Sequence, residues 1–305
     1  MIFVFKQCIK RKMIITSLAL ILLIITLTFP KAHDDLENIT ITYQKSDTSS
    51  IYLMNEDNLV ARTNVSLKNE DTLEQAKEII TYLTINSSKA NYLPIYFKAI
   101  LPSKTKLLSI DLQEDILKLN FSKNLLNVDE KDSEKMLECL VFSLTEIKGI
   151  RGILIYVENE LLDKIPHTNK ALPYILTRDI GVNKVYNLTS LKNVSKTTTY
   201  YIAKEEENIY YIPVTILENN DKSKIEIVIE HLKSSPLTET NLISYLNAST
   251  ELSNYEVLEQ TVYLSFSPLL YEGIKEDDIL ETVKYAISLS MQDTLNVQNV
   301  IFTEE

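Results

Sequence analysis

An internal duplication constrains this chain more than any other feature of its sequence. The segment LKLNFSKNLL (Leu117–Leu126) matches VYLSFSPLLY (Val262–Tyr271) at an offset of 145 residues, and an apolar segment around Ser143 meets one around Ser288 at the same offset. Two further segments precede these matches in both halves and in the same order: ITYQKSDTSSIYLMN and DTLEQAKEIITYL in the first, TYYIAKEEENIYYIP and DKSKIEIVIEHL in the second. Four matches in one order predict a single structural unit built twice.

Length and composition agree with two folded units. The chain has 305 residues, of which 45% are hydrophobic and 24% are charged, as expected for folded domains of about 100–200 residues each. We predict one unit at residues 38–190 and a second at 196–305, after an N-terminal segment at residues 1–33. The stretch Leu161–Tyr186 has no counterpart in the second copy, and we expect it to cover or link the domains.

Periodicity predicts the elements of the first unit. Residues 51–68 are β-branched and aromatic with partial alternation, which favours strands. The stretch Glu74–Leu83 carries the apolar stripe of a helix that faces a sheet, and the carboxylate of Asp71 is placed to cap its first turn. Strands at Lys106–Asp111 and Ile116–Phe121 follow, and we expect a tight turn between them.

A second helix, at Ser133–Ile147, is predicted to end at Gly149, because glycine readily adopts the left-handed conformation found at helix C-termini. A strand at Ile153–Val157 closes the unit. The second copy is expected to repeat this order, with a strand at 209–217, a helix from Asp277 and a last strand at Val297–Phe302. We therefore predict an α+β fold in which each repeat is a mixed β-sheet with two helices packed on one face.

The N-terminus predicts a membrane anchor. Residues Met13–Phe29 run for 17 positions without a charge, at the short end of the roughly 17–25 residues that span a bilayer core. Four basic residues precede this stretch, which favours a cytoplasmic location for residues 1–12 and an extracytoplasmic body. A cleaved signal peptide has the same layout, but Pro30 lies where cleavage would suffer. We therefore favour an uncleaved, single-pass transmembrane helix and localisation to the cell membrane.

Charge and composition argue against several classes of function. The net charge of −11 repels nucleic acid, and no basic stretch follows the N-terminal one, so we predict no nucleic-acid partner. The four glycines are too scattered for a phosphate-binding loop, and we predict no cofactor. Cys8 and Cys139 lie on opposite sides of the expected anchor, so we expect no disulfide within the body.

No histidine or cysteine cluster predicts a reactive centre. His33, His167 and His231 are too far apart in the sequence for a short metal-binding motif. Cys139 lies in an apolar helical run, which is typical of a small buried core residue. We therefore predict no catalytic, cofactor-binding or metal-binding residues.

Two acidic groups and two tyrosine pairs are the remaining candidates for chemistry or binding. The acids fall in expected hairpin turns, where solvated carboxylates are usual, so we do not expect them to catalyse a reaction. One tyrosine of each pair is expected to face outward, where it could contribute to an interface or bind a glycan, but packing within the sheet is the favoured explanation. The acids are Asp111 with Glu114 and Asp115, and the run Glu205, Glu206 and Glu207; the tyrosine pairs are Tyr200–Tyr201 and Tyr210–Tyr211.

Several of these segments together carry a family resemblance. In the first copy they are the strand pair about Ile41–Val65, the helix ending at Leu83, LPSKTKLLSIDLQEDILKLNFSKNLL (Leu101–Leu126), the helix Glu134–Thr145, the strand Ile153–Val157 and LPYILTRDIGVNKVY (Leu172–Tyr186). In the second copy they are VYLSFSPLL and the helix Ile279–Met291. The pattern resembles the GerMN domain, which is found in tandem in GerM-type sporulation and germination proteins of endospore-forming bacteria.

The resemblance implies a non-enzymatic, membrane-anchored protein whose repeats are similar in fold to the ring-building modules of secretion systems. Two departures are visible. Family members are commonly lipoproteins, whereas no cysteine directly follows the hydrophobic stretch here. The usual glycine–proline after the first helix is replaced by the residues at 86–88 in one copy and 234–236 in the other.

The leading hypothesis is an extracytoplasmic scaffold or assembly protein, linked to sporulation or spore germination. Its expected partners are envelope or sporulation-complex proteins, including further copies of itself. The alternative is a module that binds peptidoglycan or another cell-wall glycan, with exposed tyrosines stacked on sugars. A wall hydrolase that uses Asp111, Glu114 or Glu207 is the least favoured hypothesis.

Overall fold

The computed structural model describes residues 48–205, 208–234, 242, 246, 248–267, 270 and 277–304. These residues fall within one compact unit of the chain. The expected anchor at residues 13–29, His33 and the pair Glu206–Glu207 lie outside the described residues.

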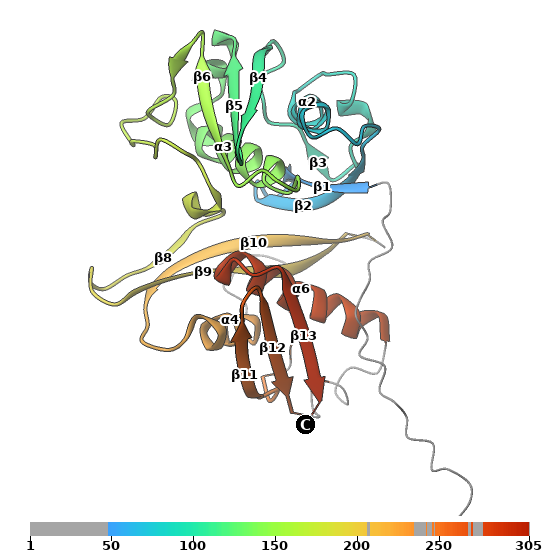
Figure 1. Ribbon diagram of the computed structural model, residues 1–305, viewed down its shortest axis with the longest axis vertical. Helices are drawn as coiled ribbons and strands as arrows, with labels where there is room; N and C mark the ends of the chain where they lie inside the picture. Colours follow the sequence, from blue (N-terminus) through green and yellow to red (C-terminus); the bar gives the residue numbers. More distant parts are fainter. Residues whose placement is uncertain are drawn as a thin grey trace, which may run out of the picture. The chain divides into compact units, whose positions relative to one another are not determined.

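The first repeat begins with a β-hairpin and continues with a helix, a second hairpin, a long helix and a strand (Figure 1). The carboxylate of Asp71 caps the first helix as predicted, accepting hydrogen bonds from the amides of Leu73 and Glu74 at 3.0 Å. The elements are β1 (Thr48–Asn55), β2 (Val60–Ser66), α2 (Thr72–Leu83), η1 (Ala90–Tyr92), β3 (Phe97–Lys98), β4 (Leu107–Gln113), β5 (Ile116–Phe121), η2 (Lys123–Asn127), α3 (Glu130–Leu144), β6 (Gly152–Val157) and β7 (Glu160–Leu161).

The second repeat has the same order of elements, after a linking segment that comprises residues 162–193. A capping box of Ser223 and Glu226 begins its first helix. The linking segment contains η3 (Arg178–Ile180) and β8 (Val185–Asn187), and the repeat contains β9 (Val194–Glu205), β10 (Asn208–Asn219), α4 (Lys224–Leu232), β11 (Leu252–Leu258), β12 (Thr261–Phe266), α6 (Asp277–Leu295) and β13 (Asn299–Glu304). The domain limits 38–190 and 196–305 stay predictions.

The strands form separate sheets rather than the single sheet per repeat that the sequence suggested. One sheet runs β4-β5-β6-β7 and another β11-β12-β13, and in each of them a parallel pair follows an antiparallel hairpin. The hairpins β1–β2 and β9–β10 lie together in a six-stranded sheet, where β2 pairs antiparallel with β10 through Arg62 and Tyr211. The α+β class is confirmed, but the predicted layering is corrected. The helix count also differs from the prediction, because the short 3₁₀ helices η1, η2 and η3 accompany the α-helices.

The long helix α3 explains this layering. All nine residues from Met136 to Leu144 are buried, so the helix is covered on all sides along this stretch. It contacts β1 of the hairpin sheet and β6 of the mixed sheet, and α6 contacts β9 and β13 in the second repeat. A helix between two sheets needs apolar residues all round, whereas the prediction assumed one sheet and one buried face.

Equivalent hydrogen bonds fix how the repeats correspond. The amide of Tyr52 donates to Ser143 Oγ at 2.8 Å, and the amide of Tyr200 donates to Ser290 Oγ at 2.8 Å. Ser143 therefore corresponds to Ser290 rather than Ser288, and β1 corresponds to β9. The offset of 145 holds for β5 and β12, but the connection to the helix is two residues longer in the second repeat.

Gly149 does not end α3. The helix ends at Leu144, and the amide of Thr145 closes its last turn by donating to the carbonyl of Val141 at 3.0 Å. Gly149 has φ +93° and lies in the connection to β6. Its left-handed conformation therefore serves the turn that follows the helix.

The membrane localisation expected from the sequence is corrected. None of the helices within the described ranges combines the length and the apolar character that crossing a bilayer requires. The longest of them, α6, has 19 residues but carries Glu281, Lys284 and Asp293, whose charges oppose insertion into hydrocarbon.

Close packing at Gly152 lets the linking segment lie against β6. Ile153 and Leu176 exchange backbone hydrogen bonds of 2.8 and 2.9 Å. A Cβ atom on Gly152 would lie 2.8 Å from Ile175 Cγ2 and 3.1 Å from the carbonyl oxygen of Leu176. The absence of a side chain at this position is therefore required for the contact.

We predict that Gly152→Ala lowers the free energy of unfolding by about 1–3 kcal/mol, because the new methyl group must displace the linking segment. Urea denaturation measures this change. The control is the same substitution in an Ile175→Ala background, where the cost should be smaller because the shortest of the three close contacts, which also include Leu176 O and Thr177 Cγ2, is removed. An equal cost in both backgrounds would contradict the explanation.

Candidate functional site

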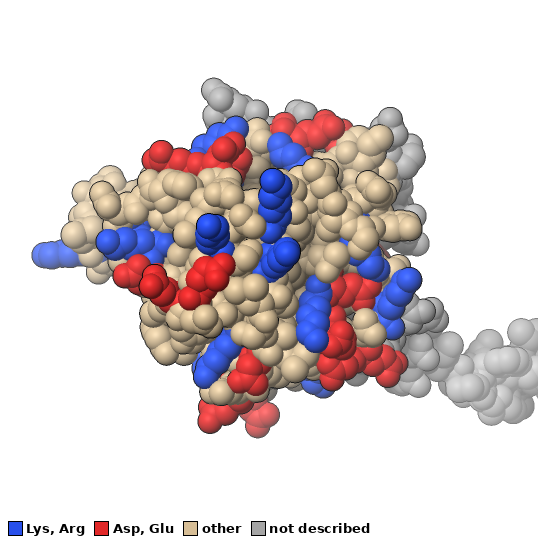
Figure 2. Space-filling view, turned by 90° about the horizontal axis from the view of Figure 1, so that it is seen from above, with Lys and Arg blue, Asp and Glu red and all other residues tan. Residues whose placement is uncertain are grey.

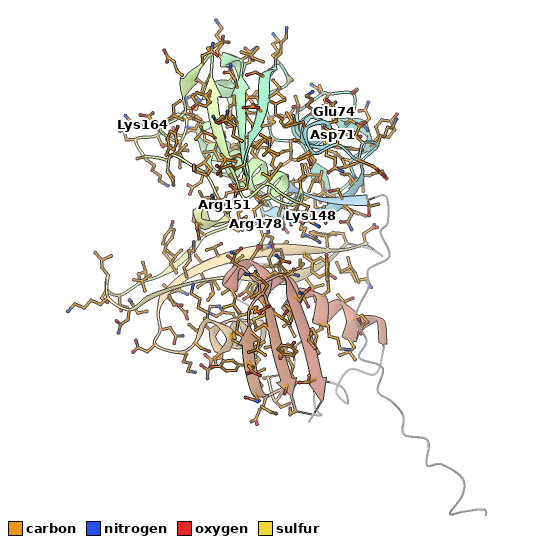
Figure 3. The ribbon with its side chains drawn as sticks, in the orientation of Figure 1. Asp71, Glu74, Lys148, Arg151, Lys164 and Arg178 are labelled. Carbon is orange, nitrogen blue, oxygen red and sulfur yellow. The ribbon has the colours of Figure 1, made fainter. Side chains whose placement is uncertain are left out.

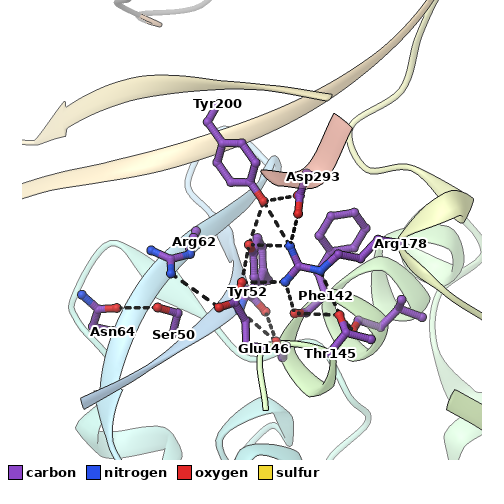
Figure 4. Close-up of polar contacts among 12 residues, drawn as sticks. Ser50, Tyr52, Arg62, Asn64, Phe142, Thr145, Glu146, Arg178, Tyr200 and Asp293 are labelled. Carbon is purple, nitrogen blue, oxygen red and sulfur yellow. Dashed lines mark hydrogen bonds and ion pairs between the residues drawn. The ribbon is translucent and has the colours of Figure 1, made fainter. Parts of the chain in front are cut away.

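A buried polar cluster joins the two repeats at equivalent positions. The phenol oxygens of Tyr52 and Tyr200 lie 2.8 Å apart, and both side chains are fully buried (Figure 4). Tyr52 Oη donates to Glu146 Oε1 at 2.9 Å, and Tyr200 Oη donates to Asp293 Oδ2 at 2.5 Å. Each acid lies three residues after the equivalent serine of its helix. The tyrosine–carboxylate pair of the first repeat therefore contacts the equivalent pair of the second repeat through the two phenol oxygens.

Arg178, labelled in Figure 3, lies in the linking segment, and its side chain bridges the two carboxylates (Figure 4). Its guanidinium donates to Glu146 Oε1 and to Asp293 Oδ1, each at 2.5 Å. The remaining donors reach Thr145 Oγ1 at 3.0 Å and the carbonyl of Phe142 at 3.1 Å, and the group lies 5.0 Å from the Phe142 ring centroid. One side chain thus holds an acid from each repeat.

Arg62 of β2 is the second cation of the cluster. Its Nη1 donates to Tyr285 Oη at 2.6 Å, and its Nη2 lies 3.5 Å from Glu146 Oε2. The Tyr285 ring also packs edge-on against Tyr211 at 5.0 Å. Arg62 therefore connects the first hairpin to the long helix of the second repeat, and two arginines balance two carboxylates.

Local backbone structure places Arg178. Thr177 caps η3 by accepting a hydrogen bond from the amide of Asp179, and Gly181 follows with φ +74°. Lys184 then binds Glu138 on α3 at 2.6 Å, which holds the segment against the first repeat. The cap, the left-handed turn and the ion pair together direct the arginine into the interface.

Burial and charge shift the pKa values in the cluster. Burial would raise the pKa of Glu146, but the charges of Arg178 and Arg62 outweigh it and lower the pKa to about 2. Burial raises the pKa of Tyr52 and Tyr200 above the ordinary tyrosine value, with the nearby acids contributing. At neutral pH the acid is ionised and both phenols keep their protons. This arrangement favours a rigid polar joint, in which each charge has a partner.

The histidine and cysteine candidates lie in separate places. His167 Nε2 lies 2.8 Å from the carbonyl of Leu126, and His231 Nε2 lies 3.3 Å from Glu218 Oε2 on another element. Cys139 is buried in α3, and burial raises the pKa of its thiol well above the usual value. In the part of the chain described, no three His, Cys, Asp or Glu side chains gather as a metal site would require.

The acidic candidates within the described residues are at least partly exposed, but only Glu114 and Asp115 lie in a turn; Asp111 lies within β4 and Glu205 is the last residue of β9. Asp111 accepts from Gln113 Nε2 at 2.9 Å, and Asp115 binds Arg151 at 2.6 Å. The hydrogen bond from Arg151 lowers the pKa of Asp115, which keeps it ionised. Glu114 lies in the turn with φ +56°. The structure therefore does not bring these acids together around an enclosed space.

The expectation that one tyrosine of each pair faces outward is wrong for Tyr200 and Tyr201. Both side chains are fully buried. They point to opposite faces of β9, as alternation requires, but each face is covered: Tyr200 contacts α6 through Ser290 and Asp293, and Tyr201 Oη donates to the carbonyl of His231 on α4. A strand covered on both faces leaves no outward side.

Sequence reasoning missed the polar cluster, although two signals were present. Glu146 and Asp293 recur three residues after equivalent serines, and Arg62 stands in an otherwise uncharged strand. Charged residues among buried elements usually have a partner.

The charges on the outer surface do not indicate a binding site in this way: Figure 2 shows basic and acidic side chains interspersed over the face seen from above.

We predict that Arg178→Met lowers the free energy of unfolding by about 2–4 kcal/mol, because it leaves two largely buried carboxylates, 19% and 10% exposed, without their shared cation. Chemical denaturation monitored by circular dichroism measures the change. Arg151→Met is the matched control, since it removes an exposed arginine–carboxylate pair and should change little. Equal effects of the two substitutions would contradict a role for burial.

We also predict that the cluster contributes to acid sensitivity. The folded-state pKa of Glu146, about 2, lies below its ordinary value of 4.5, so its contribution is complete above about pH 5 and is lost as the pH falls toward 2. The difference in unfolding free energy between the native chain and Glu146→Gln should therefore shrink between pH 5 and pH 3. A difference that stays constant across this range would contradict the assignment.

Part of the chain matches a known protein family, and most of it matches a characterised relative. The family model Germane, described as sporulation and spore germination, matches residues 50–163. The spore germination protein GerM of Bacillus subtilis strain 168 is 25% identical over 275 residues, which cover 84% of this chain and 74% of GerM.

A solved structure extends the likeness to both repeats. The tandem GerMN domains of the sporulation protein GerM from Bacillus subtilis match with a TM-score of 0.76 and 22% identity, covering 85% of this chain and 90% of that structure. This match shows that the two halves share the tandem GerMN fold. The resemblance predicted from the sequence is thus confirmed: residues 50–163 match the Germane family model, and the chain has the fold of the tandem GerMN domains.

Proposed function

We propose that this protein is a non-enzymatic assembly protein that acts in envelope complexes of sporulation or spore germination. The observation that carries the proposal is the polar joint at Tyr52 and Tyr200, which locks two similar repeats together through fully buried groups. A fixed pair of similar surfaces suits simultaneous contact with other macromolecules, because linked contacts add avidity. The sporulation setting comes from the likeness to GerM.

The chemistry of the cluster supports binding rather than catalysis. Glu146 and Asp293 are each engaged by Arg178, and the two phenols between them are inaccessible to solvent. A general acid or base must reach a substrate proton within hydrogen-bond distance. We therefore assign the carboxylates and phenols of the cluster a structural role, and we expect partner proteins to bind at the outer surface.

Exposed apolar side chains mark where that surface can be probed. Ile95 is 84% exposed in the connection between α2 and β3, and Leu191 is 92% exposed between β8 and β9. Both lie in loops, where a substitution need not disturb the core. A photoreactive amino acid at either position would report a partner without altering the polar joint.

We predict that photo-crosslinking at Ile95 and Leu191 in cells that are forming spores yields discrete larger species, with the same envelope protein or further copies of this chain identified from both positions. Samples without illumination are the control. A chain that remains monomeric at both positions throughout spore formation would contradict an assembly role.

Binding to cell-wall glycan is the second candidate, supported by Tyr174. This side chain is 64% exposed, and its phenol group is hydrogen-bonded to that of Tyr156 in β6, which places two tyrosines together on the surface where a sugar could stack. Co-sedimentation with purified sacculi distinguishes the two candidates. An assembly protein stays in the supernatant, whereas a wall-binding module sediments and loses that property with Tyr174→Ala.

A further inference from the structure

Strand β4 is an open edge of the first repeat. The sheet order is β4-β5-β6-β7, and the far side of β6 is closed by β7 and by the backbone pairing of Ile153 with Leu176. Among the residues that the structure describes, β4 pairs with β5 alone. An edge strand presents backbone N–H and C=O groups that a further strand can bind.

The turn after β4 shows which backbone groups point outward. Gln113 pairs with Ile116 across a two-residue turn whose first residue, Glu114, has φ +56°. The residues that flank such a turn form a hydrogen-bonded pair, and hydrogen-bonded pairs alternate along antiparallel strands. The N–H and C=O groups of Ile110 and Leu112 are therefore directed away from β5, toward the outer edge.

A groove of about 580 Å³ lies between this edge and α2. Helix α2 lies beside β4 in Figure 1 and contacts it. Lys77, Thr81 and Thr84 line the groove from α2 and its C-terminus, and Leu107–Ile110 line it from β4. A strand added to β4 would lie within this groove, with α2 against one of its faces.

A β-bulge turns an apolar side chain into the groove. The register shifts between Leu107 and Ser109, so Leu108 has no partner across the ladder, and it is 48% exposed. Strand β11 has a bulge at the equivalent place, between Leu252 and Asn254. Bulges that recur at one position are features of the fold that aim a side chain. Leu108 is placed to contact an apolar side chain of an added strand.

The charge that lines the groove favours one kind of occupant, and the exposed acid of β4, Asp111, lies outside this lining. The lining contains Lys77 and no acidic residue, although the chain as a whole carries a net charge of −11. Lys77 is paired with Glu74 at 2.6 Å. Lys104 and Lys106 flank the lining residues and are exposed, and neither forms an ion pair within the described ranges. An extended segment that carries acidic side chains would be attracted to this edge.

We propose that the edge of β4, together with the groove beside α2, binds an acidic, extended segment of a partner protein by strand addition. The proposal rests on the assembly role above, because it supplies the kind of partner that such a role requires. Backbone hydrogen bonds to Ile110 and Leu112 would provide affinity, and Leu108 with the lysines at 104 and 106 would provide selectivity.

The test uses the full chain and a synthetic nine-residue peptide in which valine alternates with glutamate. Fluorescence anisotropy should show saturable binding of this peptide. Binding should be at least about tenfold weaker for a counterpart with lysine in place of glutamate, and for one with alternate backbone nitrogens methylated. Hydrogen–deuterium exchange should slow in β4 (Leu107–Gln113) when the acidic peptide is bound.

Two substitutions at one residue separate the backbone contribution from the side chain. Ile110→Pro removes an outward N–H, which edge strands tolerate, and should weaken binding at least about tenfold. Ile110→Ala loses more side-chain packing but keeps the N–H, and should bind within about threefold of the native chain. The double substitution Lys104→Glu with Lys106→Glu should weaken binding of the acidic peptide and strengthen binding of the lysine peptide. Circular dichroism confirms that each variant is folded.

Three results would overturn the proposal: no saturable binding of the acidic peptide to the native chain, equal binding to Ile110→Pro and Ile110→Ala, or slowed exchange in β11 with none in β4. The crosslinking positions Ile95 and Leu191 do not lie on this edge. A negative peptide experiment therefore overturns strand addition and leaves the assembly role standing, whereas an absence of crosslinks contradicts the assembly role even where the peptide binds.

Discussion

The structure depends on a buried ion cluster at the contact between the repeats. Glu146 and Asp293 would be costly to bury singly, since an ionised carboxylate in a protein interior needs a counter-charge and hydrogen bonds. Arg178 supplies both to the pair at once, and Arg62 supplies a second counter-charge to Glu146. Separation of the repeats would break this balance, so the cluster couples their folding.

Duplication explains why equivalent residues meet. Tyr52 touches Tyr200, and the equivalent strands β2 and β10 pair antiparallel, as in a self-complementary contact between two identical subunits. Arg178 has no counterpart in this symmetry because it comes from the linking segment. A single arginine between two acids suits a contact made once within a chain, where a symmetric dimer would present two. The linking segment thus converts a dimer-like contact into a permanent one.

The sequence reveals features that depend on neighbours along the chain and conceals those that depend on distant contacts. The cap at Asp71 and the alternation in β5 are local, and both were predicted. Gly149 looked like a helix end because the helix bounds were read from periodicity, which continues past Leu144 in apolar residues that face other elements. The burial of Tyr201 could not be predicted, because it requires knowledge that α4 covers the second face of β9.

The interior of this protein and its outer surface differ in which groups remain available to a partner. Each strongly perturbed group of the cluster is engaged by another part of the same chain, so the joint has little left to offer a ligand. The linking segment also closes one edge of the first mixed sheet, through the pairing of Ile153 with Leu176. What it leaves uncovered is the opposite edge, where backbone groups, an exposed apolar side chain and lysines lie together. A protein whose internal contacts are satisfied in this way meets its partners through edges and loops, where unpaired backbone and exposed side chains remain.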